Sequence, residues 1–144
     1  MVLPRFIAAA KANEPLRVFG DGAQSRCFCL VHDVVESLVR LQKSGCDALV
    51  AKQKGDGASP PPVFGEIFNI GGTEEVSMLE LAKLVVKTLG SKSKIELIPY
   101  DKAYAPGFDD MRRRKPLVEK LERFVKFRPR TTLREIIKVT AETI

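Results

Sequence analysis

The chain has 144 residues, a length that suits one domain with a modest core. Hydrophobic residues make up 44% and charged residues 29%, which is ordinary for a globular protein and argues against a disordered or fibrous class. The net charge of +6 and the pI near 9.4 suggest nucleic-acid binding. However, acidic residues are interspersed with the basic ones, aromatic residues do not alternate with them, and no common nucleic-acid module matches. We therefore expect a basic surface and no nucleic-acid partner.

The chain shows no apolar run long enough to cross a bilayer and no secretory pattern at its start, so we expect a cytoplasmic protein without a membrane partner. Its three cysteines, Cys27, Cys29 and Cys46, include no C-x-x-C pair, and there is only one histidine. The cysteines are therefore predicted to be small apolar residues and not metal ligands or a redox pair. The segment 1–4 leads directly into a helical pattern, which suggests a truncated chain that begins inside a larger fold.

Apolar spacing predicts a helix over 2–12, a strand over 16–19 and a second strand over 26–31. Asp33 is predicted to cap the next helix. The apolar stripe of that helix should be formed by Val34, Val35, Leu38, Val39 and Leu41. From 42 to 63 the pattern dissolves into Lys, Gly, Ser and Pro, which predicts a flexible insertion.

The second half of the chain predicts a strand over 66–72, a helix from the Ser77 capping box to Leu89, and a strand over 95–98. Pro116 is expected in the first turn of a short helix, and a capping box at Thr132 should open the terminal helix, with Ile136, Ile137, Val139 and Thr140 facing inward. These elements do not alternate as simple βαβ units. We therefore predict a mixed α/β (α+β) fold that is an appendage to a sheet and not a doubly wound domain.

Two segments suit a nucleotide diphosphate. In the segment 20–26, Gly20 and Gly22 supply a turn that a ligand can approach closely, and the Arg26 guanidinium can bind two oxygens at once. In the segment 107–130, Asp109 and Asp110 precede four consecutive cations at 112–115. Carboxylates pair with ribose hydroxyls and guanidinium groups with phosphates. Taken alone, the first segment also fits a glycine-rich hairpin and the second a solvated charge run.

Together these segments resemble the carboxyl-terminal, substrate-binding part of the extended short-chain dehydrogenase/reductase family, the NAD-dependent nucleotide-sugar epimerases, dehydratases and decarboxylases. The resemblance covers nearly the whole chain except 42–63. It implies that the backbone of one strand lies along the base and that an arginine meets the diphosphate. It further implies a carboxylate on the ribose and one or two arginines on the phosphates. Carried over, the substrate-binding residues are Arg17, Val18, Phe19, Arg26, Asp110, Arg113 and Arg114. Lys126 stands where members usually have glycine.

The family's glycine fingerprint for NAD and its Tyr-x-x-x-Lys pair are both absent from the sequence, because Tyr100 and Tyr104 are followed four residues later by Tyr104 and Phe108. We therefore expect no catalytic residue and no cofactor site in this chain, with NAD belonging to the full-length enzyme. His32 has no nucleophile placed beside it and is predicted to be structural. The resemblance implies a nucleotide-diphospho-sugar ligand, with a UDP-sugar preferred. The alternative is a non-catalytic interaction protein or relic domain that pairs with a Rossmann partner or with itself.

Overall fold

The computed structural model describes residues 1–54, 63, 65–100 and 111–144, and the side chains of 1–47 within the first range. Its chain forms two compact units. Unit 1 contains residues 1–28, 74–115 and 132–144, and unit 2 contains residues 29–73 and 116–131. No helix in the described ranges is both long and apolar enough to span a membrane.

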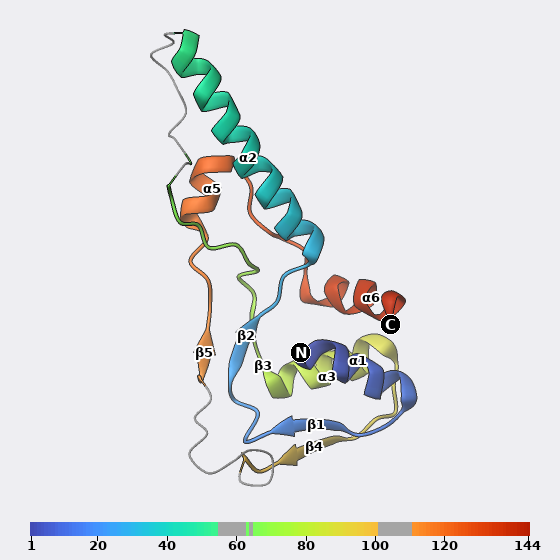
Figure 1. Cartoon of the computed structure of the whole chain (residues 1–144). Helices are drawn as coiled ribbons and strands as arrows, with labels where there is room; N and C mark the ends of the chain where they lie inside the picture. Colours follow the sequence, from blue (N-terminus) through green and yellow to red (C-terminus); the bar gives the residue numbers. More distant parts are fainter. Residues whose placement is uncertain (55–62, 64, 101–110) are drawn as a thin grey trace. The chain divides into compact units, whose positions relative to one another are not determined.

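Unit 1 is built around three helices that pack on one another, α1 (Val2–Ala12), α3 (Met78–Leu89) and α6 (Leu133–Thr143) (Figure 1). Each helix buries residues at three- and four-residue spacing, which is the pattern of an amphipathic helix. The buried residues of α1 are Leu3, Phe6, Ile7 and Ala10. Those of α3 and α6 include Leu81, Val85, Ile136 and Ile137. Both predicted capping boxes, at Ser77 and at Thr132, are confirmed.

The strands of unit 1 form two small sheets. Strand β1 (Leu16–Phe19) pairs in parallel with β4 (Ile95–Ile98), and it packs against α1 and α3 (Figure 1). Strand β2 (Ser25–Cys27) lies between antiparallel β3 (Glu75–Ser77) and parallel β5 (Arg113–Arg114). The predicted mixed α/β fold class is therefore confirmed.

Unit 2 contains α2 (Val31–Lys54) and the shorter α5 (Glu119–Val125), which contact each other. The Phe68 and Phe124 rings meet edge to face at 5.2 Å, and Lys120 Nζ donates to Glu66 Oε2 at 2.5 Å. Leu121 and Val125 are the buried residues of α5. These contacts fix the extended segment 66–72 against α5.

Two sequence predictions at helix starts are wrong, because Asp33 lies inside the first turn of α2 and Pro116 precedes α5, which begins at Glu119. Three further predictions of element bounds differ from the structure. First, α2 continues through 42–54, where a loop was predicted. A sequence rich in Lys, Gln and Ala is a good helix former even without a regular apolar stripe. Residues 55–62 and 64 of the predicted loop lie outside the described residues. Second, β2 ends at Cys27 and α2 starts at Val31, because the partner strands of β2 are only two or three residues long. Third, 66–72 packs on α5 instead of pairing as a strand.

The apolar stripe predicted for α2 is not a buried face. Val35 is 51% exposed, and Leu38 and Val39 are each 53% exposed. Val139 on α6 is also 37% exposed, although Ile136 and Ile137 are buried as expected. Because large apolar side chains at i, i+3 and i+4 normally pack against a partner, α2 presents an apolar face that the described residues do not cover.

Replacing Lys126 by glycine is expected to stabilise the protein by about 1 kcal/mol, because a left-handed backbone costs a residue with a Cβ roughly that amount. Lys126 ends α5 with a φ of 52°. Urea unfolding followed by circular dichroism would measure the gain. Lys126→Ala is the control, since it removes the charge and keeps the Cβ; an equal gain in that variant would show that backbone strain is not the cause.

Candidate functional site

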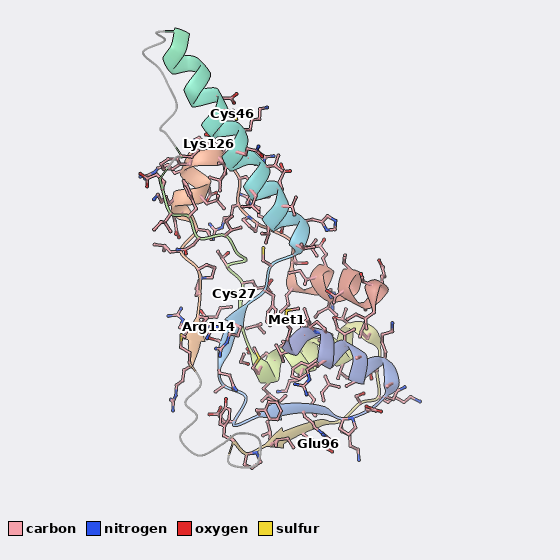
Figure 2. The ribbon with its side chains drawn as sticks, in the orientation of Figure 1. Met1, Cys27, Cys46, Glu96, Arg114 and Lys126 are labelled. Carbon is pink, nitrogen blue, oxygen red and sulfur yellow. The ribbon has the colours of Figure 1, made fainter. Side chains whose placement is uncertain are left out.

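Unit 1 holds a cavity of about 960 Å³ between α1, β1, the turn that leads into β2, the start of α3 and β4. Figure 2 shows two of its lining residues, Met1 at the start of α1 and Glu96 on β4. Four predicted site residues line it: Arg17, Val18, Phe19 and Arg26. The cavity is also lined by residues that sequence reasoning did not place in the site: Arg5, Glu14, Gln24, Glu96, Ile98 and Tyr100. Phe6, which lines it too, is buried in the core.

The turn after β1 depends on glycine. Gly20 has a φ of 68°, and a Cβ there would overlap the Tyr100 ring. The ring therefore lies directly against the turn. Gly22 has a φ of 71°, and a Cβ there would meet Val18 Cγ1 at 2.9 Å and Leu79 Cβ at 3.0 Å. Because Gly20 and Gly22 have no Cβ, the turn can lie closer to the cavity wall and to α3 than it could with any other residue at these positions.

Two backbone carbonyls, one from its own strand and one from the segment before β5, hold Arg26 at the cavity. Its Nη1 donates to Ser25 O and to Met111 O, each at 2.7 Å. These contacts order a long side chain whose rotamer entropy would otherwise oppose ligand binding. A guanidinium that is fixed in a cavity wall is a suitable partner for a carboxylate or phosphate.

Arg113 and Arg114 of the second predicted segment form β5, which pairs with β2. The Arg113 guanidinium binds the Glu75 carboxylate through two hydrogen bonds of 2.8 Å, and Ser25 Oγ donates to the same carboxylate at 2.6 Å. Arg114 is exposed on β5 (Figure 2). Neither arginine is among the described residues that line the cavity. Asp110 lies outside the described residues.

The Glu75 pair is expected to make the stability of unit 1 sensitive to acid. Hydrogen bonds from Arg113 and Ser25 hold the pKa of the Glu75 carboxyl at about 2, below the usual 4.5. A lowered folded-state pKa adds stability that is complete above the unfolded pKa and is lost as the pH falls from about 4.5 towards about 2. Glu75→Gln should therefore be less stable than the parent at pH 7 and equally stable near pH 2.

Thermal melts from pH 7 down to pH 2 would test this expectation. The exposed Glu142 near the end of α6 supplies the control variant, Glu142→Gln, which should follow the parent at each pH. A difference between Glu75→Gln and the parent that stays constant across this range would contradict the assignment.

The cysteines and His32 are the other side chains that the sequence singled out. Burial raises the pKa of the Cys27 and Cys29 thiols, so both are held as neutral thiols, and all three cysteines are unpaired. His32 is exposed in the first turn of α2. In the ranges that the structure describes, His, Cys, Asp and Glu form no group that could hold a metal ion.

Comparison with known proteins identifies relatives of this architecture. Residues 1–71 match the NAD dependent epimerase/dehydratase family. The chain is 36% identical over 141 residues to a UDP-N-acetyl-alpha-D-glucosaminuronate decarboxylase of Bacillus cytotoxicus, covering 98% of this chain and 39% of that protein. It is 36% identical over 134 residues to UDP-glucuronic acid decarboxylase 4 of Arabidopsis thaliana, covering 93% and 25%. The chain therefore spans between a quarter and two fifths of the length of these relatives.

Solved structures share the fold. An epimerase of Methanothermobacter thermautotrophicus superposes with a TM-score of 0.75 at 21% identity, covering 99% of this chain and 36% of that one. UDP-glucuronic acid 4-epimerase of Bacillus cereus, solved with UDP-glucuronic acid and NAD, superposes with a TM-score of 0.72 at 21% identity, covering 99% and 38%. The family match over 1–71 and the relatives at 36% identity, which align over nearly the whole chain, support the NAD-dependent epimerase/dehydratase family as the family of this chain.

Proposed function

We propose that this chain is the nucleotide-sugar-binding portion of an NAD-dependent epimerase, dehydratase or decarboxylase, and that its ligand is a UDP-sugar. The observation that carries the proposal is the cavity of unit 1, which brings β1, the glycine turn and Arg26 together. The names of the relatives, which include decarboxylases of UDP-sugar acids, support the choice of ligand class. Unpaired cysteines agree with a cytoplasmic location.

In this proposal the base lies along the backbone of Arg17, Val18 and Phe19, and the Arg26 guanidinium binds the diphosphate. The cavity is mixed in character, with apolar and aromatic side chains beside charged ones, as a base joined to a diphosphate requires. Asp110 is proposed to reach the ribose hydroxyls, and Arg113 and Arg114 the phosphates. Glu75 binds the Nε and Nη2 of Arg113, and a guanidinium has five N–H donors, so Arg113 can contact a phosphate without losing this pair.

NAD does not fit the described residues of this chain. The Gly20–Gly22 turn follows β1 and leads into β2, whereas a dinucleotide cradle needs a glycine turn that opens a helix after a strand. Together with the missing Tyr-x-x-x-Lys pair, this leads us to propose that the isolated chain is inactive. Its role is recognition, in which the binding energy of the nucleotide orients the sugar for chemistry performed elsewhere.

Isothermal titration calorimetry of the chain with UDP, UDP-glucuronic acid and NAD tests the proposal. We expect the two uridine compounds to bind and NAD to give no heat. Binding of NAD with the uridine compounds silent would overturn the assignment. A folded chain that binds none of the three would overturn it as well.

The exposed face of α2 favours a second candidate function, a non-catalytic interaction protein that pairs with a Rossmann partner. Val31, Val35, Leu38 and Val39 are each more than half exposed and share one side of α2. Sedimentation velocity of the chain, mixed with the NAD-binding part of the Bacillus cytotoxicus relative, would test it. Association that Leu38→Lys abolishes supports this function; two species that sediment independently would rule it out.

A further inference from the structure

Gln24 lies at the start of β2 in the wall of the cavity and is only 9% exposed. Its Nε2 donates to Phe19 O at 3.0 Å and also to the Tyr100 hydroxyl. A backbone carbonyl can only accept, so the amide atom that faces Phe19 O must be the nitrogen. The opposite atom, Oε1, is therefore an acceptor with a fixed position.

This oxygen is buried and has no hydrogen-bond partner among the residues that the structure describes. A buried acceptor left unpaired costs about 1–3 kcal/mol, so its retention calls for an explanation. A donor on a ligand that enters the cavity would pair it. An ionised diphosphate has no hydrogen to donate, so the donor must come from the base, the ribose or the sugar.

The surroundings favour the base. Phe19 and Tyr100 both line the cavity, and the Gln24 amide is bonded to the backbone carbonyl of Phe19 and to the side-chain hydroxyl of Tyr100. Flat aromatic side chains suit a flat nucleobase. Gln24 is also tied to the end of β1, the strand along which the proposed function places the base.

We propose that Gln24 is the residue that selects the nucleobase, with Oε1 accepting the N3–H of uracil. The inference rests on the proposed function and adds a specificity-determining residue to it. Uracil and thymine carry a hydrogen on N3, whereas cytosine carries a lone pair there. That lone pair would face the lone pairs of Oε1, so a cytosine nucleotide is disfavoured.

The base cannot reach this oxygen without moving a neighbour, because Oε1 is almost wholly covered. Tyr100 is the side chain whose hydroxyl touches the same amide and whose ring lies against Gly20. Binding should therefore change the environment of Tyr100. The chain has no tryptophan and two tyrosines, so tyrosine emission in a Tyr104→Phe background reports on Tyr100.

The test compares UDP, 3-methyl-UDP and 2′-deoxy-UDP by calorimetry, on the chain and on its Gln24→Met variant. The parent should bind 3-methyl-UDP about tenfold more weakly than UDP, which is the factor for one lost hydrogen bond to a buried acceptor. Gln24→Met should bind UDP more weakly by a similar factor and lose the preference between the two. Any effect of the 2′-hydroxyl should be equal in both proteins. UDP should also change the Tyr100 emission, whereas 3-methyl-UDP should change it less.

Four results would overturn the proposal. If the parent binds UDP and 3-methyl-UDP equally, or if Gln24→Met keeps the full preference, the selection by Gln24 fails while nucleotide binding stands. If the parent binds 2′-deoxy-UDP more weakly than UDP and only this difference in affinity disappears in Gln24→Met, Oε1 of Gln24 pairs with the ribose instead. If no uridine compound binds, the proposed function fails too. Should Gln24→Met not fold, the comparison of the two bases on the parent decides the question.

Discussion

Replacing Gly22 by alanine is expected to destabilise the protein by about 2–4 kcal/mol, the sum of a left-handed backbone that carries a Cβ and an overpacked contact. Gly22 has a φ of 71°, and its Cβ would stand 2.9 Å from Val18 Cγ1 and 3.0 Å from Leu79 Cβ. Both neighbours belong to packed elements, β1 and α3, so neither can withdraw freely. Urea unfolding followed by circular dichroism would measure the loss.

Gly90→Ala is the matched control for this prediction. Gly90 also has a positive φ, of 64°, but a Cβ there would meet no atom within 4 Å. It should therefore cost only the backbone component, about 1 kcal/mol. Equal losses in the two variants would show that the close approach of the turn to Val18 and Leu79 contributes nothing.

Replacing Arg26 by alanine is expected to weaken UDP binding about 10- to 100-fold, the range for losing charge-assisted hydrogen bonds to a phosphate. The side chain lines the cavity and is ordered by Ser25 O and Met111 O. Calorimetry with UDP and with uridine separates the causes. Because uridine has no phosphate, its affinity should change little if Arg26 binds the diphosphate.

Two further variants sharpen the Arg26 prediction. Arg26→Lys keeps the charge but loses the planar fork, so its loss should be intermediate. Arg130→Ala makes the same charge change at a side chain that is 80% exposed in unit 2, and it should bind UDP like the parent. Equal weakening by Arg130→Ala would mean that net charge, and not the position of Arg26, governs binding.

The sequence predicted the elements that carry local chemical signals. The α1 helix, β1, β4 and the capped starts of α3 and α6 were placed correctly, because their apolar spacing and capping residues act within a few positions. The strand β5 was not predicted. It is two residues long and exists only because Arg113 and Arg114 pair with β2, a contact between segments far apart in the chain.

The candidate site could be predicted only in part for the same reason. Arg17 to Phe19 and Arg26 line one cavity, since the turn between them is local, and their binding of substrate stays a prediction. Tyr100 and Glu96 join them through the pairing of β1 with β4, for which the sequence holds no register signal. The bond between Arg113 and Glu75 likewise depends on β3 and β5 flanking β2. Arg113 belongs to the run of cations at 112–115 that suggested a phosphate site, and its bond to Glu75 also links β5 to β3.

The most direct test of the account is the NMR mapping of backbone amide shifts as UDP is added to the labelled chain. The account predicts that the largest shift changes occur at Tyr100 and at residues 17–26, which span β1, the glycine turn and the start of β2. The amide shifts of α2 and α5 should not change. Shifts confined to α2 and α5, or a spectrum unchanged at saturating UDP, would contradict it.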